Sequence, residues 1–282
     1  MVSTSFDYQR ADTVQEAIKL LQEHNGDAKL LAGGHSLIPA MKLRLNSPAL
    51  LIDVSRIEAM RGIREKDGQI IIGAMTTHYE IATSELLANK LPMLVAAAKV
   101  IGDVQVRNKG TIGGSLAHAD PAADWPAVVL AANAQLHIHG PSGERMVSAG
   151  DFFTGFYSTA LEDDEILTDL HFPIPPKGSK STYVKFAQPA SRYALVGCAV
   201  QVSMDGDSVS DCSIAFTGVS DAAFRDTAAE DALRGKALNA DSIKSAADAA
   251  AEGVDIMSDH FASEEYRKHL AKVFLKRALE SL

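Results

Sequence analysis

The sequence predicts an α/β N-terminal part up to about residue 177 and an α+β part after it. Before residue 173, short apolar strands alternate with helical segments. After residue 180, three strands come together and three helical segments follow them. Between the two parts lie Pro173, Pro175, Pro176 and Gly178, which make this segment the best linker candidate. The length of 282 residues suits one large domain or two ordinary ones.

Capping residues mark the helices of the first part. Thr13 and Glu16 form a capping-box pattern before apolar residues at helical spacing, and Asn25-Gly26 is a stop signal. Thr77 and Glu80 repeat the capping-box pattern. The patterns predict helices over residues 13–24, 37–45, 77–88, 91–101 and 122–132.

Turn residues define the strands. The dipeptide Asp67-Gly68 predicts a hairpin over residues 62–73, and the turn at Gly140 to Gly143 predicts another over 135–147. Further strands are expected at 29–32, 50–54 and 166–172 in the first part, and at 183–186, 194–204 and 208–218 in the second. Helices over 227–233, 240–252 and 263–279 complete the prediction.

Charge and cysteine content exclude several classes of protein. The net charge of −9 argues against a nucleic-acid binder, which needs a basic surface. Cys198 and Cys212 are far apart, so we expect two buried thiols and neither a disulfide framework nor an iron–sulfur cluster. The longest apolar runs reach about eight residues, whereas a membrane span needs about twenty. We therefore expect a cytoplasmic protein that does not span a membrane.

Two glycine-rich motifs are the main candidates for chemistry. They are Ala32-Gly33-Gly34-His35-Ser36, between a strand and a helix, and Thr111-Ile112-Gly113-Gly114-Ser115, expected to be a loop. Paired glycines allow a phosphate to approach backbone N–H groups, and the hydroxyls add donors without charge. The motifs could hold the two phosphates of one dinucleotide. The alternative is that both are turns that need positive φ. Neither motif matches the dinucleotide-binding or P-loop fingerprints.

The other polar residues point to no specific chemistry. His118 and Asp120 could belong to a metal site or a proton relay, but polar loop residues are the simpler interpretation. His137 and His139 alternate on a strand, so we expect them on one solvated face. No catalytic residue and no metal ligand is therefore predicted in this chain.

The sequence resembles the flavin subunits of molybdenum hydroxylases. Both glycine motifs carry the resemblance, together with their flanking residues 37–45 and 101–110, the segments 120–124 and 185–193, and the tail 266–270. Within that family, the medium subunits of aerobic carbon monoxide dehydrogenases are the most similar branch. The flavin subunits of xanthine, nicotine-type and aldehyde dehydrogenases are alternatives, and a non-redox nucleotide-binding module is another.

The resemblance implies a domain organisation. Residues 1–177 would form an FAD-binding domain of the PCMH or vanillyl-alcohol-oxidase type, with two α/β subdomains at about 1–57 and 58–177. Residues 178–282 would form an α+β domain of the CO dehydrogenase flavoprotein type, with a three-stranded antiparallel sheet and helices.

The resemblance also implies site residues. The pyrophosphate of FAD would be wrapped by backbone amides of Ala32, Gly33, Gly34, His35, Ser36, Thr111, Gly113, Gly114 and Ser115. Asp124 would hydrogen-bond the FAD, Leu161 and Lys185 would lie beside the adenine or flavin, and Tyr193 would pack near the isoalloxazine. FAD would be bound non-covalently, although His35 follows two glycines as in some covalent flavoproteins.

Finally, the resemblance implies partners. A small subunit with two [2Fe–2S] clusters and a large subunit with the molybdenum cofactor would assemble with this chain as a dimer of heterotrimers. Electrons would pass from the clusters through FAD to an external acceptor. The flavin then supplies the chemistry, so this chain needs no catalytic acid or base.

Overall fold

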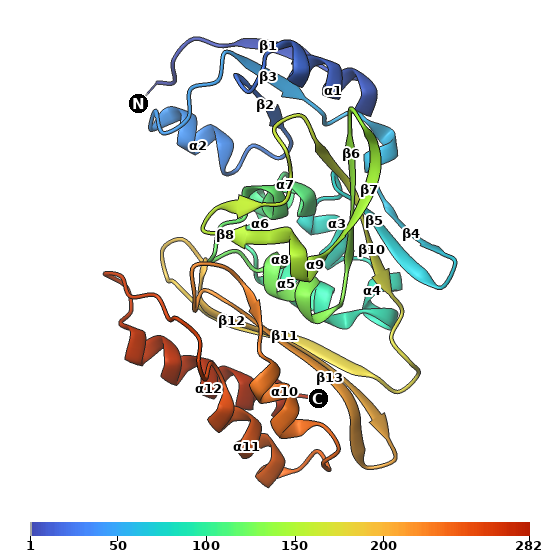
Figure 1. Cartoon of the computed structure of the whole chain (residues 1–282), viewed down its shortest axis with the longest axis vertical. Helices are drawn as coiled ribbons and strands as arrows, with labels where there is room; N and C mark the ends of the chain where they lie inside the picture. Colours follow the sequence, from blue (N-terminus) through green and yellow to red (C-terminus); the bar gives the residue numbers. More distant parts are fainter. Residues whose placement is uncertain (1) are drawn as a thin grey trace.

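A small parallel sheet forms the N-terminal unit at the top of the molecule (Figure 1). The computed structural model describes residues 2–282, and in it the strand order of this sheet is β1-β3-β2. The Thr13 side chain accepts a hydrogen bond from the Glu16 N–H at the start of α1, whereas the Glu16 carboxylate accepts from the N–H of Asp12. The elements are β1 (Asp7–Arg10), α1 (Val14–Glu23), β2 (Ala28–Leu31), α2 (Leu37–Lys42) and β3 (Leu50–Asp53).

A five-stranded antiparallel sheet lies in the middle of the molecule. Its order is β4-β5-β10-β6-β7, so β10 enters between two hairpins that precede it in sequence. The strands are β4 (Ile63–Lys66), β5 (Gln69–Gly73), β6 (Gln135–Gly140), β7 (Gly143–Ser148) and β10 (Ile166–Pro173). The pair β8 (Phe153–Gly155) and β9 (Ser158–Thr159) lies between β7 and β10 in sequence.

Short helices accompany the middle sheet. The expected capping box of Thr77 and Glu80 is present at α3, but the helix predicted over 77–88 is two helices that meet at Thr83 and Ser84. The helices are η1 (Glu58–Met60), α3 (His78–Ala82), α4 (Glu85–Lys90), α5 (Pro92–Val100), α6 (Val104–Arg107), α7 (Ile112–His118), α8 (Trp125–Ala131) and α9 (Ala149–Phe152).

The C-terminal sheet has helices on both faces. In sheet order its strands are β11 (Lys180–Ala187), β12 (Ala194–Asp205), β13 (Ser208–Thr217) and β14 (Phe224–Arg225), so a two-residue fourth strand extends the three that the sequence predicts. One face packs on α5 and α8 of the middle unit. The other packs on α10 (Thr227–Leu233) and α12 (Glu264–Glu280), with α11 (Ala240–Ala249) beside them (Figure 1).

Two hydrophobic cores correspond to these layers. The first joins the N-terminal and middle units and includes Tyr183, Ala199 and Ala215 from the C-terminal sheet. The second fills the space between that sheet and the last three helices. The chain passes from β10 to β11 through residues 174–179, where the sequence predicts the domain boundary. Because the first core includes residues of the C-terminal sheet, the two parts are firmly packed together.

Cys198 and Cys212 are buried free thiols, as expected. Burial raises the pKa of the Cys212 thiol to about 12 and also raises that of Cys198. Among residues 2–282, none of the helices combines the length and the apolar character that crossing a bilayer requires.

Candidate functional site

The two glycine motifs are in contact with each other. A Cβ atom added to Gly33 would clash with the Lys109 backbone carbonyl and lie 2.7 Å from the Gly110 Cα. A Cβ atom on Gly114 would lie 3.4 Å from the Ala32 Cβ. The segments before α2 and at the start of α7 therefore form one continuous surface, although they are far apart in sequence.

The motifs differ in how their backbone N–H groups are used. For Gly33, Gly34, His35 and Ser36, no acceptor within residues 2–282 is in hydrogen-bonding geometry with the N–H. In the second motif, the N–H groups of Ile112 and Gly113 donate to the backbone carbonyls of Thr76 and Ala74. The N–H groups of Gly114 and Ser115 donate to the hydroxyl and the backbone carbonyl of Thr111. The four distances are 2.9–3.2 Å. Four amides of the second motif therefore have protein acceptors, so we expect the amide contacts to a pyrophosphate to come mainly from the first motif. Thr111 is buried and its hydroxyl caps α7, whereas Ser115 is half-buried and its hydroxyl can reach a ligand.

The second motif is also a helix rather than a loop. Thr111 is extended, with φ −117°, and its hydroxyl caps α7 by accepting from the Gly114 N–H. Glycines are poor helix formers, which is why the sequence pattern predicted a loop here. Their role is close packing: a Cβ on Gly113 would lie 2.8 Å from the Ala74 Cα. Of the four paired glycines only Gly34 has a positive φ, at +73°, so the alternative that all are turn residues fails for the other three.

The loop between β11 and β12 brings Tyr193 to the first motif. The Ser36 hydroxyl lies close enough to the Tyr193 hydroxyl to affect its pKa, and Tyr193 remains 39% exposed. Burial and the nearby Asp120 carboxylate raise the pKa of Tyr193, while the Ser36 hydroxyl acts in the opposite direction. An aromatic ring is thus placed beside the free N–H groups and can contact a bound ligand.

Asp124 lies at the start of α8 and is engaged with other side chains. It accepts hydrogen bonds from Tyr183 Oη at 2.6 Å and from Lys185 Nζ at 3.0 Å, and it is 5% exposed. Burial raises the pKa of the Asp124 carboxyl, against the effect of Lys185 and Tyr183. Lys185 also donates to the Arg192 carbonyl at 2.7 Å. The three side chains therefore connect α8 to β11 and to the residue before Tyr193.

Three residues that the sequence analysis did not assign lie in the same region. Tyr157 Oη donates to the Asp120 carboxylate at 3.0 Å, and the Tyr157 ring meets that of His118 edge-on at 5.2 Å between centroids. Asp120 is also among the groups that raise the pKa of Tyr193. The sequence had singled out His118 and Asp120 but treated them as polar loop residues. Tyr157 carries no motif, and only its left-handed backbone, φ 51°, distinguishes it.

Leu161 lies apart from these groups in sequence and packs against the first core. It is half-buried on the segment between β9 and β10, next to the acidic residues 162–165. Its expected place beside the adenine or flavin stays a prediction.

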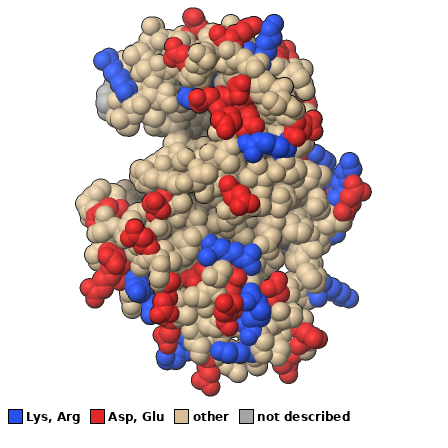
Figure 2. Space-filling model, viewed as in Figure 1, with Lys and Arg blue, Asp and Glu red and all other residues tan. Residues whose placement is uncertain are grey.

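A hollow separates the N-terminal unit from the middle of the molecule. Figure 2 shows it on the left of the space-filling view, and Figure 1 shows that α2 and α7, the helices that follow or contain the glycine motifs, lie above and below it. The space is open to solvent on this side. A long ligand could therefore reach both motifs from outside.

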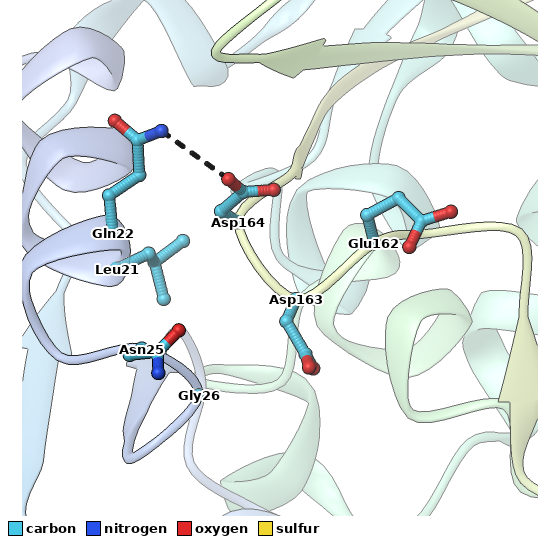
Figure 3. Close-up of a pocket in the computed structure, with 7 residues that line it drawn as sticks. All are labelled: Leu21, Gln22, Asn25, Gly26, Glu162, Asp163 and Asp164. Atoms are coloured by element: carbon cyan, nitrogen blue, oxygen red, sulfur yellow. Dashed lines mark hydrogen bonds between the residues drawn. The ribbon is translucent and has the colours of Figure 1, made fainter.

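A half-open pocket elsewhere has the wrong chemistry for an anionic ligand. It lies between the end of α1 and residues 162–164, has a volume of about 400 Å³, and carries three carboxylates, those of Glu162, Asp163 and Asp164 (Figure 3). Gln22 donates to Asp164 at 3.4 Å across it. None of the residues predicted to bind a ligand lines this pocket.

Comparison with known proteins identifies the family. Residues 4–175 match the FAD binding domain in molybdopterin dehydrogenase, and residues 181–282 match the CO dehydrogenase flavoprotein C-terminal domain. The carbon monoxide dehydrogenase medium chain of Hydrogenophaga pseudoflava is 41% identical over 281 residues, which cover 100% of this chain and 98% of the relative. The glyceraldehyde dehydrogenase medium chain of Sulfolobus acidocaldarius is 37% identical over the full length of both.

A solved structure gives the same result. A carbon monoxide dehydrogenase from Hydrogenophaga pseudoflava that lacks the Mo-pyranopterin moiety of its cofactor superimposes with a TM-score of 0.96 and 42% identity, over 99% of this chain and 98% of the other. The protein therefore belongs to the FAD-binding medium subunits of the molybdenum hydroxylases.

Proposed function

We propose that this chain binds FAD non-covalently between its two glycine motifs, as the electron-transfer subunit of a carbon monoxide dehydrogenase. The observation that carries the proposal is the set of free N–H groups from Gly33 to Ser36. Unpaired backbone donors on consecutive residues form a concave anion site, which suits the pyrophosphate of a dinucleotide.

The Ser115 hydroxyl would complete this anion site. It belongs to the motif that contacts Ala32, and it adds no charge. The chain carries a net charge of −9, so its overall field opposes an anion and local donors must compensate. Tyr193 would contact the isoalloxazine; the tyrosine lies near Ser36, and the Lys185–Arg192 contact fixes the residue before it.

The redox chemistry belongs to the flavin, which can exchange electrons one or two at a time when bound. The two cysteines of this chain are buried on β12 and β13, with Cys198 opposite Phe216 and Cys212 opposite Val202. Two cysteines cannot ligate a [2Fe–2S] cluster, which needs four. We therefore assign the clusters to a small partner subunit and the molybdenum cofactor to a large one, in a dimer of heterotrimers.

Carbon monoxide is the proposed substrate of the complex because carbon monoxide dehydrogenase medium chains of two organisms match this chain over at least 99% of its length. An aldehyde is the alternative, since a glyceraldehyde dehydrogenase subunit is 37% identical over the same length. The test is to co-express this chain with the large and small subunits of a carbon monoxide dehydrogenase and to follow flavin absorbance under each substrate. We expect bleaching by carbon monoxide only when all three chains are present.

Two outcomes would contradict the proposal. Bleaching by glyceraldehyde and not by carbon monoxide would reassign the substrate while leaving the FAD site intact. Bleaching of the isolated chain by a small organic substrate would make it a self-sufficient oxidase.

A further inference from the structure

A cluster of histidine and carboxylate side chains lies on the outer face of the middle sheet, away from the glycine motifs in sequence. His137 and His139 extend from β6, and Asp169 and His171 from β10. Their side chains are 21%, 17%, 10% and 21% exposed. This corrects the expectation of a solvated face, because the strand β10 inserts beside β6 and shields the two histidines.

The sheet register fixes the positions of these side chains. Asp169 is directly opposite His137 in the antiparallel pair, and the register shifts between Leu167 and Asp169, as at a β-bulge. His137 Nδ1 lies 3.2 Å from Asp169 Oδ2, and His171 Nε2 lies 2.6 Å from Asp169 Oδ1. Two imidazole nitrogens therefore converge on one carboxylate from the two central strands of the sheet.

We propose that His137, Asp169 and His171 bind a divalent transition-metal ion of the zinc class. Their ligand atoms all lie within 4.8 Å of one another. Two imidazoles and a carboxylate are a donor set typical of Zn²⁺ and related ions, which would take water at the remaining positions. The two histidines are partly exposed, so water can reach the ion.

The outer nitrogens of both imidazoles already have the acceptor partners that a metal site needs. His171 Nδ1 lies 3.2 Å from Gln69 Oε1, and His137 Nε2 lies 3.3 Å from Glu144 Oε2. The Thr168 hydroxyl donates to Asp169 Oδ2 at 3.1 Å. Without an ion, the Asp169 carboxylate can only accept, so the inner nitrogen of each imidazole carries the proton of its contact with Asp169. Binding of an ion would move that proton to the outer nitrogen, where Gln69 and Glu144 provide acceptors.

A second trio, His137, His139 and Glu144, also brings ligand atoms together, but it is less suited to a metal. Glu144 is 60% exposed on the edge hairpin, so coordination would have to immobilise it. Asp169 is 10% exposed on the central strand and needs no such ordering. In the proposed site Glu144 instead offsets part of the charge of the ion from outside.

The test is a Zn²⁺ titration of the untagged, EDTA-dialysed full chain, with Co²⁺ absorption as a report on the ligand geometry. We expect one ion per chain, and H137N and H171N should each weaken Zn²⁺ binding by at least about tenfold. H139N should change it by less than about threefold, because His139 is outside the first set of ligands. The matched control is H269N, an exposed histidine on α12, which should bind like the wild type.

Unchanged urea unfolding of H171N in EDTA would show that the variant loses the metal and not the fold. If the wild type bound Zn²⁺ no more tightly than the H137N/H171N double variant, the proposal would be wrong. It would also be wrong if H139N lost the ion while H171N kept it, because the second trio would then be the site.

Discussion

The Lys185 ammonium and the Asp124 carboxylate form a buried ion pair, 2.9 Å apart, with side chains only 4% and 6% exposed. The pair joins the first turn of α8, in the middle unit, to β11 of the C-terminal sheet. Tyr183 donates to the same carboxylate. The connection also fixes the loop that carries Tyr193 because Lys185 donates to the Arg192 carbonyl.

Replacing Asp124 with asparagine should strongly destabilise the protein. Lys185 would remain buried without its counter-charge, and breaking a buried pair from one side costs about 3–5 kcal/mol. The D124N/K185M double variant should recover much of the loss. Urea unfolding measures both. The control is D248N, which breaks the exposed Lys244–Asp248 pair and should cost no more than about 0.5 kcal/mol. If D124N and D248N lost the same free energy of unfolding, burial would not make the Asp124–Lys185 pair more important for stability than the exposed pair.

Acid should destabilise the fold through His78. Burial, with smaller effects of His35 and Arg107, lowers the pKa of His78 to about 3. Its Nδ1 accepts a hydrogen bond from Trp125 Nε1 at 3.1 Å, which requires the neutral ring. The folded pKa is below the unfolded value of about 6.5, so the contribution is complete above pH 6.5 and is lost as the pH falls toward 3.

At pH 5 the loss should be about 2 kcal/mol for this histidine alone. The H78N variant keeps an acceptor for Trp125 but cannot titrate, so its stability should fall less between pH 7 and pH 5 than that of the wild type. Unfolding curves at the two pH values give the comparison. An identical fall in the two proteins would assign the acid sensitivity to other groups.

Gly114→Val should weaken FAD binding by at least about tenfold, or about 1.4 kcal/mol. A Cβ atom at this position would lie 2.8 Å from Thr111 Oγ1 and 3.4 Å from the Ala32 Cβ, so valine would push the two motifs apart. The matched control is G150V in α9, where an added Cβ would have only Ser148 Oγ nearby, at 3.7 Å, which is ordinary van der Waals contact. Fluorescence titration of both apoproteins with FAD is the measurement. If G114V bound FAD as tightly as G150V, the pyrophosphate would lie elsewhere.

The aromatic ring of Tyr193 should contribute to FAD binding. Loss of one aromatic contact costs about 0.5–1.5 kcal/mol, so Y193L should bind FAD about 2- to 12-fold more weakly and leave the bound flavin more fluorescent. Y193F keeps the ring and should quench flavin as the wild type does. Tyr79 on α3, 49% exposed, provides the control Y79L. Equal quenching in Y193L and the wild type would contradict a contact between Tyr193 and the flavin.

Local sequence patterns predicted most of the helices and strands, because helix caps and the alternation of apolar and polar residues depend only on neighbouring residues. Thr77 with Glu80 and Pro92 mark helix starts where the structure has them. Several short elements were missed, among them β1, α6, α9, β8, β9 and β14. Asp103 caps α6 and Ser148 caps α9, but each helix has only four residues and so no apolar periodicity to mark it. The helix α7 was missed for another reason: Gly113 and Gly114 disfavour a helix locally, and packing against Ala74 and Ala32 overrides that preference.

The sequence predicted which residues belong to the candidate site better than it predicted the contacts that these residues make. The sequence indicates which glycines are paired, but not that their N–H groups differ in availability, because the acceptors of the second motif come from Ala74 and Thr76. Nor does it show that Asp124 faces Lys185 and Tyr183. Such contacts depend on long-range packing, which no local pattern encodes.

The most direct test of the account is amide NMR on chain labelled with ¹⁵N-glycine and ¹⁵N-serine, recorded before and after FAD is added. We expect the signals of Gly33, Gly34 and Ser36 to shift and to gain protection from hydrogen exchange, because their N–H groups have no protein acceptor. Those of Gly113 and Ser115 should already be protected without FAD. Stoichiometric flavin binding that leaves the Gly33, Gly34 and Ser36 signals unchanged would contradict the proposed site.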